Sequence, residues 1–457
     1  MRSGPDTGVR RDEHGPNRWF LLFGVWLLYA SFGLVATSLA PLVPIIEADL
    51  GLSHASMGSI LGAWQFVYIF AAVPCGVLLD RIGPRRALAL GAIVIAASAL
   101  GRSIASGYPS LLLAVMLFGI GGPIISAGAP KVVTDLFSGP NRGFAMGIYM
   151  TGPAMGGIVS LTLTHSVLLP GFDGKWRAVL ALWASVTLAA GVFWWIIAPA
   201  RGDHQALERS SRTPHAPPRS QLRVVEDLLR SPSVRLVMLM SVGLFTFNHG
   251  LNNWLPELLR SGGMGLIEAG YWAAIPTVVG IAGSLLIPRL ATPPRRFTIL
   301  FVLCLAALAA SLLLQSLHPS TLLVGLFMQG IARSALMTVL ILTLVELPDI
   351  GDERAGSASG LFFSSAEVGG VLGPLSLGLL YDVTGEFGAG LFVLSAISVA
   401  LALATLRLRS LAHRPAQLAS AGEPREIRRP IRRKRRRVLR RRRTDRRWSM
   451  TGRGTEC

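Results

Sequence analysis

The sequence contains few charged residues. Asp, Glu, Lys and Arg make up 15% of its 457 residues, whereas soluble domains carry about 25%. Hydrophobic residues make up 51%. A chain with so little charge and so much apolar surface is typical of a protein that crosses a membrane several times, and this balance argues against a soluble globular protein.

Cysteine is also scarce, and the three present are Cys75, Cys304 and Cys457. Two lie within apolar runs and the third is the last residue, so no disulfide framework is indicated. The sequence shows no Walker loop, no Cys/His metal spacing and no Gly-x-Ser-x-Gly elbow, which argues against an ATP-driven pump and against an enzyme. We therefore expect no catalytic residue, no metal site and no cofactor.

No cleavable signal peptide is evident, because residues 1–18 are polar and the run after them is long enough to be a first membrane helix. In all, twelve runs reach the ~20 apolar residues that span a bilayer. They are 19–40, 56–79, 87–105, 110–134, 143–169, 176–199, 234–258, 268–290, 297–317, 321–345, 355–380 and 388–409.

A polar linker rich in Pro and Arg, at 200–233, divides these runs into two sets of six. We expect an all-α membrane protein whose twelve transmembrane helices form two pseudo-symmetric six-helix bundles, at 19–199 and 234–409. An N-terminal segment, 1–18, precedes the bundles, and a tail, 410–457, follows them. We expect the protein to be a monomer.

Basic residues are concentrated in alternate loops. One set of loops contains Arg81, Arg85, Arg86, Arg142 and the arginines of the linker, and the other set contains few. Short cytoplasmic loops are enriched in Lys and Arg. This pattern predicts a protein of the cytoplasmic membrane with both termini in the cytoplasm.

The tail supplies most of the net charge of +19. Residues 414–457 hold sixteen Arg and one Lys against four acids. Such blocks are usually disordered and bind anionic surfaces. With one aromatic residue, Trp448, and no folding pattern, the tail favours contact with anionic lipid over nucleic acid, although an extension without a function stays open.

The two halves repeat in sequence. Gly119 and Gly330 are 211 residues apart, and Gly143, Gly147, Gly156 and Gly157 recur 213 residues later as Gly356, Gly360, Gly369 and Gly370. An ordered series of such offsets favours duplicated six-helix bundles. Two bundles that rock about a shared cavity would give alternating access to a site near the membrane midplane.

A charged turn joins the second and third apolar runs. It reads Gly76-Val-Leu-Leu-Asp80-Arg81-Ile-Gly83-Pro-Arg85-Arg86. This pattern resembles the loop between helices 2 and 3 of the major facilitator superfamily of transporters. The resemblance implies that these residues latch the cytoplasmic side when the protein faces outward, and we include Arg142 of the next cytoplasmic loop in this gating set. The alternative is that the arginines only set the topology.

Glycine and proline interrupt the fifth and eleventh apolar runs. Residues proposed for close helix packing are Gly152, Pro153, Gly156, Gly157, Gly369, Gly373 and Pro374. Such residues let helices approach and bend; tight packing alone and a moving-helix role are both open. The stretch 147–157 also resembles a motif of proton-coupled drug antiporters, with its first glycine one residue out of place.

Arg333 lies near the middle of the tenth run, where an uncompensated charge costs roughly 3 kcal/mol. It either binds an anionic substrate or pairs with a buried carboxylate. Glu367, halfway along the eleventh run, is the matching acid and could instead carry a coupling proton. Lys131 is expected to reach the cytoplasmic interface.

Polar and aromatic residues in other runs complete the candidate substrate site. Asn248 and Asn252 share one helical face, and His249 between them is a candidate for both substrate binding and proton coupling. The remaining candidates are Gln329, Trp64, Gln65, Tyr68, Tyr29 and Phe32. For each, packing between helices is the alternative.

Residues 248–258 and 283–289 resemble the cyanate/nitrate-like branch of the superfamily. This resemblance implies a small anion or a compact polar solute as cargo. We therefore expect a secondary transporter, with proton coupling open. The alternatives are a proton-coupled drug or metabolite efflux antiporter and a membrane sensor with the transporter fold.

Overall fold

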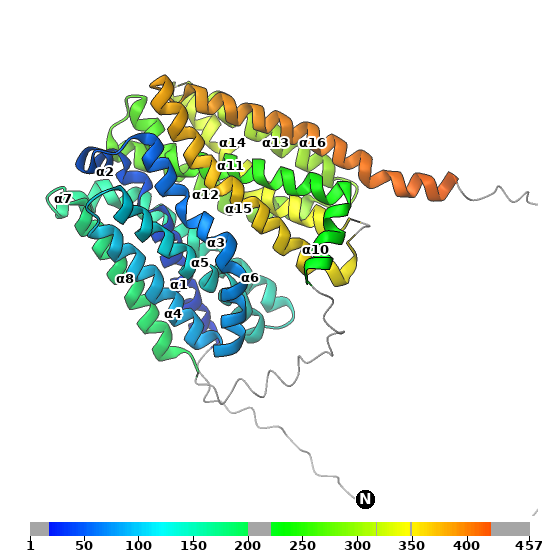
Figure 1. Cartoon of the computed structure of the whole chain (residues 1–457), viewed down its shortest axis with the longest axis horizontal. Coiled ribbons are helices and arrows are strands. Elements are labelled where there is room, and N and C mark those ends of the chain that lie inside the picture. Colours follow the sequence, from blue (N-terminus) through cyan, green and yellow to red (C-terminus); the bar gives the residue numbers. More distant parts are fainter. Residues whose placement is uncertain (1–17, 200–220, 317, 348–349, 422–457) are drawn as a thin grey trace, which may run out of the picture. The chain divides into compact units, whose positions relative to one another are not determined.

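The computed structural model describes residues 18–199, 221–316, 318–347 and 350–421. The chain is almost entirely helical (Figure 1). Within these residues, twelve helical segments are long and apolar enough to cross a membrane. Each expected span falls on one of them, so the protein is a multi-pass, all-α membrane protein.

The helices follow one another with short connections. The first half contains α1 (Arg18–Thr37), η1 (Ala40–Leu42), α2 (Val43–Leu50), α3 (His54–Ile82), α4 (Pro84–Ser103), α5 (Tyr108–Leu136), α6 (Pro140–Leu163), η2 (Thr164–Leu168), α7 (Leu169–Gly171) and α8 (Trp176–Ile197). The second half contains α10 (Gln221–Arg230), α11 (Pro232–Ser261), α12 (Leu266–Leu290), α13 (Arg296–Leu313), α14 (Pro319–Val345), α15 (Gly351–Thr384) and α16 (Gly388–Ala421).

Three boundaries differ from the sequence prediction. The first span, expected at 19–40, ends as a helix at Thr37, and the chain continues through η1 and α2 because Pro41 and Pro44 cannot extend a helix. The linker, expected at 200–233, ends in a helix, α10, whose Leu228 is buried. The last helix runs to Ala421, beyond the expected end at 409.

The sequence repeat has a counterpart in the packing of the helices. A Cβ at Gly156 of α6 would overlap the carbonyl oxygen of Ala30 in α1, and a Cβ at Gly369 of α15 would overlap that of Val242 in α11. The two glycines are 213 residues apart and their partners 212 apart. Equivalent helix pairs in the two halves therefore touch backbone to backbone at equivalent positions.

The two halves meet along α3 and α15, which lie side by side (Figure 1). A Cβ at Gly58 would lie 2.5 Å from the carbonyl oxygen of Pro374, and one at Gly62 would lie 2.9 Å from that of Val371. These contacts lie near the end of the molecule opposite the linker, which we call the distal end. The other end, where α8 ends and α10 begins, we call the linker end.

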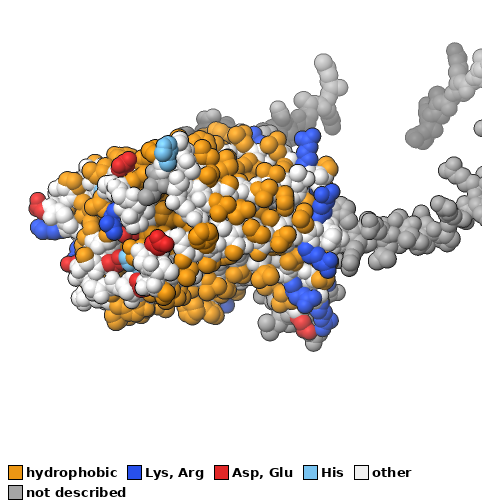
Figure 2. All heavy atoms as spheres, turned by 90° about the horizontal axis from the view of Figure 1, so that it is seen from above, with side chains coloured by type: hydrophobic (Ala, Val, Ile, Leu, Met, Phe, Trp, Pro, Cys, Tyr) orange, Lys and Arg blue, Asp and Glu red, His pale blue; other side chains and the backbone are white. Residues whose placement is uncertain are grey.

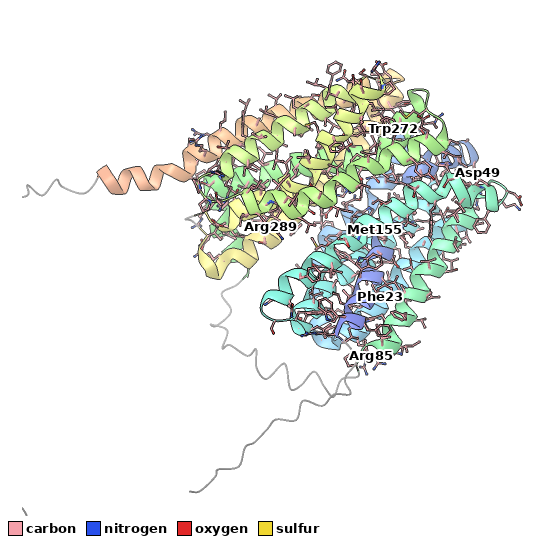
Figure 3. All side chains as sticks on the ribbon, turned by 180° about the vertical axis from the view of Figure 1, so that it is seen from behind. Phe23, Asp49, Arg85, Met155, Trp272 and Arg289 are labelled. Atoms are coloured by element: carbon pink, nitrogen blue, oxygen red, sulfur yellow. The ribbon has the colours of Figure 1, made fainter. Side chains whose placement is uncertain are left out.

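At the linker end, the halves separate. In Figure 3, Arg85 of the first half and Arg289 of the second lie well apart, whereas Asp49 and Trp272 lie near the distal end where the halves meet. A Cβ at Gly76 of α3, or at Gly356 or Gly360 of α15, would meet no atom within 4 Å. The same two helices are thus in contact at one end and apart at the other.

The outer surface of the helices is apolar. Phe70, Ile196, Leu239 and Val278 are among its large exposed side chains, with 53–72% of their surface accessible. Figure 2 shows hydrophobic side chains over the middle of one face, with Lys and Arg gathered toward one end. This surface matches a hydrocarbon environment, whereas the same exposure in water would promote aggregation.

Arg102 lies elsewhere than its position in the sequence suggests. The sequence places it at the edge of a loop, but its side chain is buried to 1% exposure. Its Nη1 donates to the carbonyl oxygen of Val35 at 2.8 Å and to Ser38 Oγ at 3.3 Å, at the point where α1 ends. The guanidinium therefore adds a donor to a carbonyl oxygen in the last turn of α1, where a helix runs short of backbone N–H partners.

We predict that Gly156→Ala lowers the stability of the protein, because the added methyl group forces α6 away from the backbone of α1. Overpacking of this kind costs typically about 1–3 kcal/mol. Gly143→Ala is the matched control, since it lies on the same helix and its Cβ would meet no atom within 4 Å. The measurement is the apparent Tm of the purified protein in detergent, and equal Tm values for the two variants would contradict the prediction.

Candidate functional site

A cavity of about 380 Å³ lies between the two halves. Helices α1, α3 and α6 supply its wall on the first half, and α11, α12 and α14 supply its wall on the second. A cavity of this volume falls within the range of pockets that bind small molecules. Its position between two repeated bundles is where alternating-access transporters bind their cargo.

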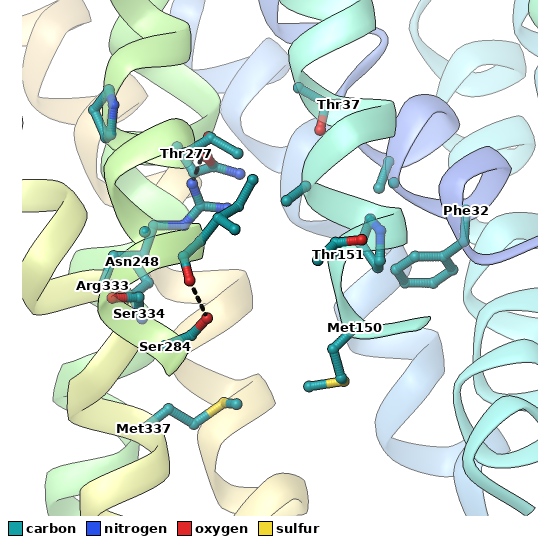
Figure 4. A pocket seen from close by; sticks show the side chains of 18 of the residues that line it. Phe32, Thr37, Met150, Thr151, Asn248, Thr277, Ser284, Arg333, Ser334 and Met337 are labelled. Carbon is teal, nitrogen blue, oxygen red and sulfur yellow. Dashed lines mark hydrogen bonds between the residues drawn. The ribbon is translucent and has the colours of Figure 1, made fainter. Parts of the chain in front are cut away.

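Arg333 lines this cavity from α14 (Figure 4). Its Nη1 donates to Thr277 Oγ1 of α12 at 2.9 Å. Among the described residues, no ion pair joins Arg333 to Glu367. In this conformation Arg333 is therefore not the structural partner of Glu367. A hydroxyl group satisfies one N–H, which leaves the guanidinium able to bind an anion in the cavity.

Asn248, His249 and Asn252 also line the cavity, from α11. The side-chain carbonyl oxygen of Asn248 is buried and has no hydrogen-bond partner among the described residues. The amide nitrogen of Gln65 donates to Nδ1 of His249 at 3.1 Å, which ties α3 of one half to α11 of the other. The cavity wall on α11 therefore presents amide groups beside an imidazole whose Nδ1 is already engaged.

The opposite wall is aromatic. Tyr29 and Phe32 of α1 and Trp64 of α3 line it. The ring centroids of Tyr29 and Phe32 are 5.5 Å apart, and those of Phe32 and Trp64 are 6.3 Å apart at an interplanar angle of 88°. Contacts within this cluster hold the rings in fixed orientations at the cavity surface.

Four candidate residues do not line the cavity. Gln65 and Gln329 are buried, with 0% and 2% exposure, and Glu367 is 6% exposed within α15. The hydroxyl of Tyr68 forms a hydrogen bond with Ser126 Oγ at 2.8 Å, inside the first half. In this conformation Gln65, Tyr68 and Gln329 are therefore not among the residues that line the cavity, and their contact with a substrate stays a prediction.

The structure adds cavity residues that the sequence analysis missed. They lie on α12, at Thr277, Gly280, Ile281 and Ser284, with Ser334 beside Arg333 and with Met150 and Thr151 on α6. The four α12 positions follow the i, i+3, i+4, i+7 spacing of one helical face. Thr277, Gly280 and Ser284 are small or polar residues on this face of an apolar helix, which is a signal that could have identified it.

The predicted gating residues lie at the linker end, and the side-chain contacts of Asp80 and Arg85 stay within the first half. Asp80 accepts a hydrogen bond from Lys131 Nζ at 2.6 Å. Arg85 donates to the carbonyl oxygen of Trp195 at 2.9 Å, with its guanidinium over the indole ring of the same residue. Arg86 and Arg142 are exposed. The charged turn is therefore braced against its own bundle while the linker end is open.

The distal end is closed by a cluster around His54, the first residue of α3. Its ring stacks on Tyr381 with centroids 3.8 Å apart and on Trp254 at 5.2 Å. Asp382 accepts hydrogen bonds from the backbone N–H groups of His54 and Ala55, at 3.1 and 2.9 Å. A carboxylate of one half thus caps a helix of the other.

Trp254 of this cluster is completely buried. Its Nε1 donates to the carbonyl oxygen of Pro374 at 2.8 Å. The indole is therefore part of the packing between α11 and α15, beneath the His54 cluster.

Comparison with known proteins decides the family. The family model described as Major Facilitator Superfamily matches residues 25–345 and 294–452. The chain belongs to the Major Facilitator Superfamily. Its two halves and the cavity between them are those of a transporter of this superfamily, and the protein is accordingly a small-molecule transporter of the membrane.

Two curated relatives align with most of this chain. A quinolone resistance transporter of Acinetobacter baumannii is 25% identical over 382 residues, which cover 77% of this chain and 84% of the relative. A hexuronate transporter of Bacillus subtilis (strain 168) is 23% identical over 402 residues, covering 83% and 92%. The crystal structure of a nucleoside transporter matches the fold with a TM-score of 0.69 at 14% identity, covering 86% of this chain and 99% of that one.

These relatives do not support the cyanate/nitrate-like branch of the superfamily that the sequence analysis suggested. The segments behind that resemblance, 248–258 and 283–289, lie in α11 and α12. A Cβ at Gly283 would overlap Ser334 Oγ of α14, so this glycine has a place in helix packing apart from any cargo.

Proposed function

We propose that this protein is a secondary active transporter that moves a small organic anion across the cytoplasmic membrane by alternating access. The observation that carries the proposal is the position of Arg333, a membrane-buried cation that faces a cavity between the two halves. The hexuronate transporter among its relatives supports an anionic organic cargo. By the distribution of arginines, the linker end is the cytoplasmic one, and this conformation then faces inward.

We predict that Arg333→Gln abolishes transport of the anion. Loss of a hydrogen bond to a charged group weakens binding by about 10- to 100-fold. The measurement is counterflow of labelled carboxylates, a hexuronate and benzoate among them, in liposomes that contain the purified protein. Arg295→Gln, an exposed arginine at the linker end, is the control. Unchanged counterflow in Arg333→Gln would contradict the role of this residue in the transport of the anion.

A second candidate function is export of the anion instead of its uptake. The quinolone resistance transporter among the relatives, together with the aromatic wall, supports export as the second candidate. In cells given the labelled anion, a proton uncoupler lowers accumulation if protons drive uptake and raises it if they drive export. A label distribution that does not respond to the uncoupler would argue against proton coupling in either direction.

Glu367 is our candidate for the coupling residue. Its carboxyl group is buried, and Oε2 has no partner among the described residues. A Cβ at Gly370 would lie 2.9 Å from Glu367 Oε2 and 2.9 Å from Gln65 Cγ, so both side chains lie against the same glycine. Gln65 in turn donates to His249 at the cavity wall. This arrangement connects a protonatable group to the substrate site across the interface between the halves.

We predict that Glu367→Gln retains exchange of the anion but no longer responds to a pH gradient, because glutamine keeps the shape of the side chain and cannot bind a proton. The measurement is counterflow and gradient-driven uptake in the same liposomes. A variant that still concentrates the anion when a pH gradient is imposed would remove Glu367 from coupling.

The gating residues act in the opposite conformation. The contacts Gly58–Pro374 and Gly62–Val371 define an antiparallel register between α3 and α15. Continued toward the linker end, this register places Gly76 opposite Gly356, where both now face open space. Rocking of the two halves would bring these glycines together and carry the charged turn of 76–86 against α15.

We predict that Gly76→Leu or Gly356→Leu slows transport by at least about 10-fold and leaves the Tm unchanged, because the added side chain fits this conformation and blocks the other. The control is Gly171→Leu, at a position where a Cβ also meets open space but on the distal side. Transport rates like those of the unsubstituted protein in both variants would rule out contact between Gly76 and Gly356.

A further inference from the structure

The two walls of the cavity differ in chemistry. The wall of the second half carries the guanidinium of Arg333 with the side chains of Asn248 and Ser284, and the wall of the first half carries the rings of Tyr29, Phe32 and Trp64. In Figure 4, Arg333 and Asn248 lie on one side of the cavity and Phe32 on the other. A cargo that contacts both walls therefore has a polar end and an apolar end.

The charge of the cavity sets the charge of the cargo. Among the described residues that line it, Arg333 is the one arginine or lysine, and no Asp or Glu is present. A single carboxylate satisfies this guanidinium, whereas the second carboxylate of a dianion would be left without a cation in a largely apolar space. Burial of an unpaired charge is strongly unfavourable, so the lining favours a monoanion over a dianion.

The aromatic wall sets the shape of the apolar end. Phe32 and Trp64 are held in place by Phe118, whose ring centroid is 5.1 Å from that of Phe32 and 5.3 Å from that of Trp64. Tyr29 is held by Tyr149, with centroids 5.6 Å apart. Rings fixed in this way offer flat faces and edges to a further ring.

We propose that the cavity is specific for aromatic monocarboxylates. Arg333 binds the carboxylate, the ring of the cargo packs against Phe32 and Trp64, and the side chain of Asn248, on the same side of the cavity as Arg333, binds a hydroxyl or amino substituent. The volume of about 380 Å³ accommodates one ring or two fused rings. This proposal rests on the proposed transport of an organic anion and names its chemical class.

The first test compares ligands on the unsubstituted protein. Benzoate, cyclohexanecarboxylate, benzamide and D-galacturonate are titrated into the purified full chain by calorimetry. We expect benzoate to bind about 2- to 10-fold more tightly than cyclohexanecarboxylate, since aromatic pairs add to the burial of apolar area. Benzamide, which lacks the charge, is expected to bind about 10- to 100-fold more weakly than benzoate.

The second test uses variants. Phe32→Leu is expected to remove the preference for benzoate over cyclohexanecarboxylate while both still bind. Phe66→Leu is the matched control, because this ring is 51% exposed on the outer surface of the same bundle and does not line the cavity. Arg333→Gln is expected to make benzoate bind no better than benzamide.

The outcomes separate the two proposals. If D-galacturonate or cyclohexanecarboxylate binds as tightly as benzoate, the aromatic specificity is overturned and the transport of an organic anion stands. If no carboxylate binds, and Arg333→Gln has no effect on counterflow of any anion, both proposals fail. The comparison of ligands on the unsubstituted protein decides the question even if Phe32→Leu does not fold.

Discussion

The close approach of helix backbones at glycine is the constraint on which this structure depends. Lipid offers no hydrophobic force between helices, so their association relies on packing and on hydrogen bonds. At Gly156 and Gly369 the neighbouring carbonyl oxygen occupies the space that a side chain would need. These contacts build each bundle, and those at Gly58 and Gly62 join the two bundles to each other. A larger residue at any of them would separate helices that the cavity requires to be close.

The interface between the halves explains how one structure can serve two conformations. Contacts along α3 and α15 are made at the distal end and are absent near Gly76 and Gly360. The polar contacts follow the same division, because Asp382 caps α3 across the interface, whereas Asp80 pairs with Lys131 of its own bundle. If the halves rock as rigid bodies, closure at one end is coupled to opening at the other, and the small residues allow both without distortion of the helices.

The cavity combines a buried charge with a surface that cannot satisfy it fully. Thr277 accepts one hydrogen bond from Arg333, and the described residues around the cavity include no carboxylate. A charge held in this way is costly to the fold, and an anionic cargo would lower that cost. The aromatic rings opposite contribute apolar area instead of hydrogen bonds. The two walls together therefore specify a cargo more narrowly than either wall does alone.

The sequence by itself determined the membrane spans, the two-fold repeat and the charged turn that resembles a loop of the superfamily, because hydrophobic length and residue spacing act locally along each helix. It also identified Arg333, Asn248 and the ring residues Tyr29, Phe32 and Trp64, since polar or aromatic residues in apolar helices are conspicuous. Only the tertiary structure decided which of them share the cavity. Gln65, Tyr68 and Gln329 are likewise polar or aromatic residues in apolar helices, yet the rotation of their helices turns them away from the cavity. The cavity face of α12 and the His54 cluster arise from helices that are distant in sequence. Helix rotation and the pairing of the two halves depend on contacts across the whole fold, which local pattern does not encode.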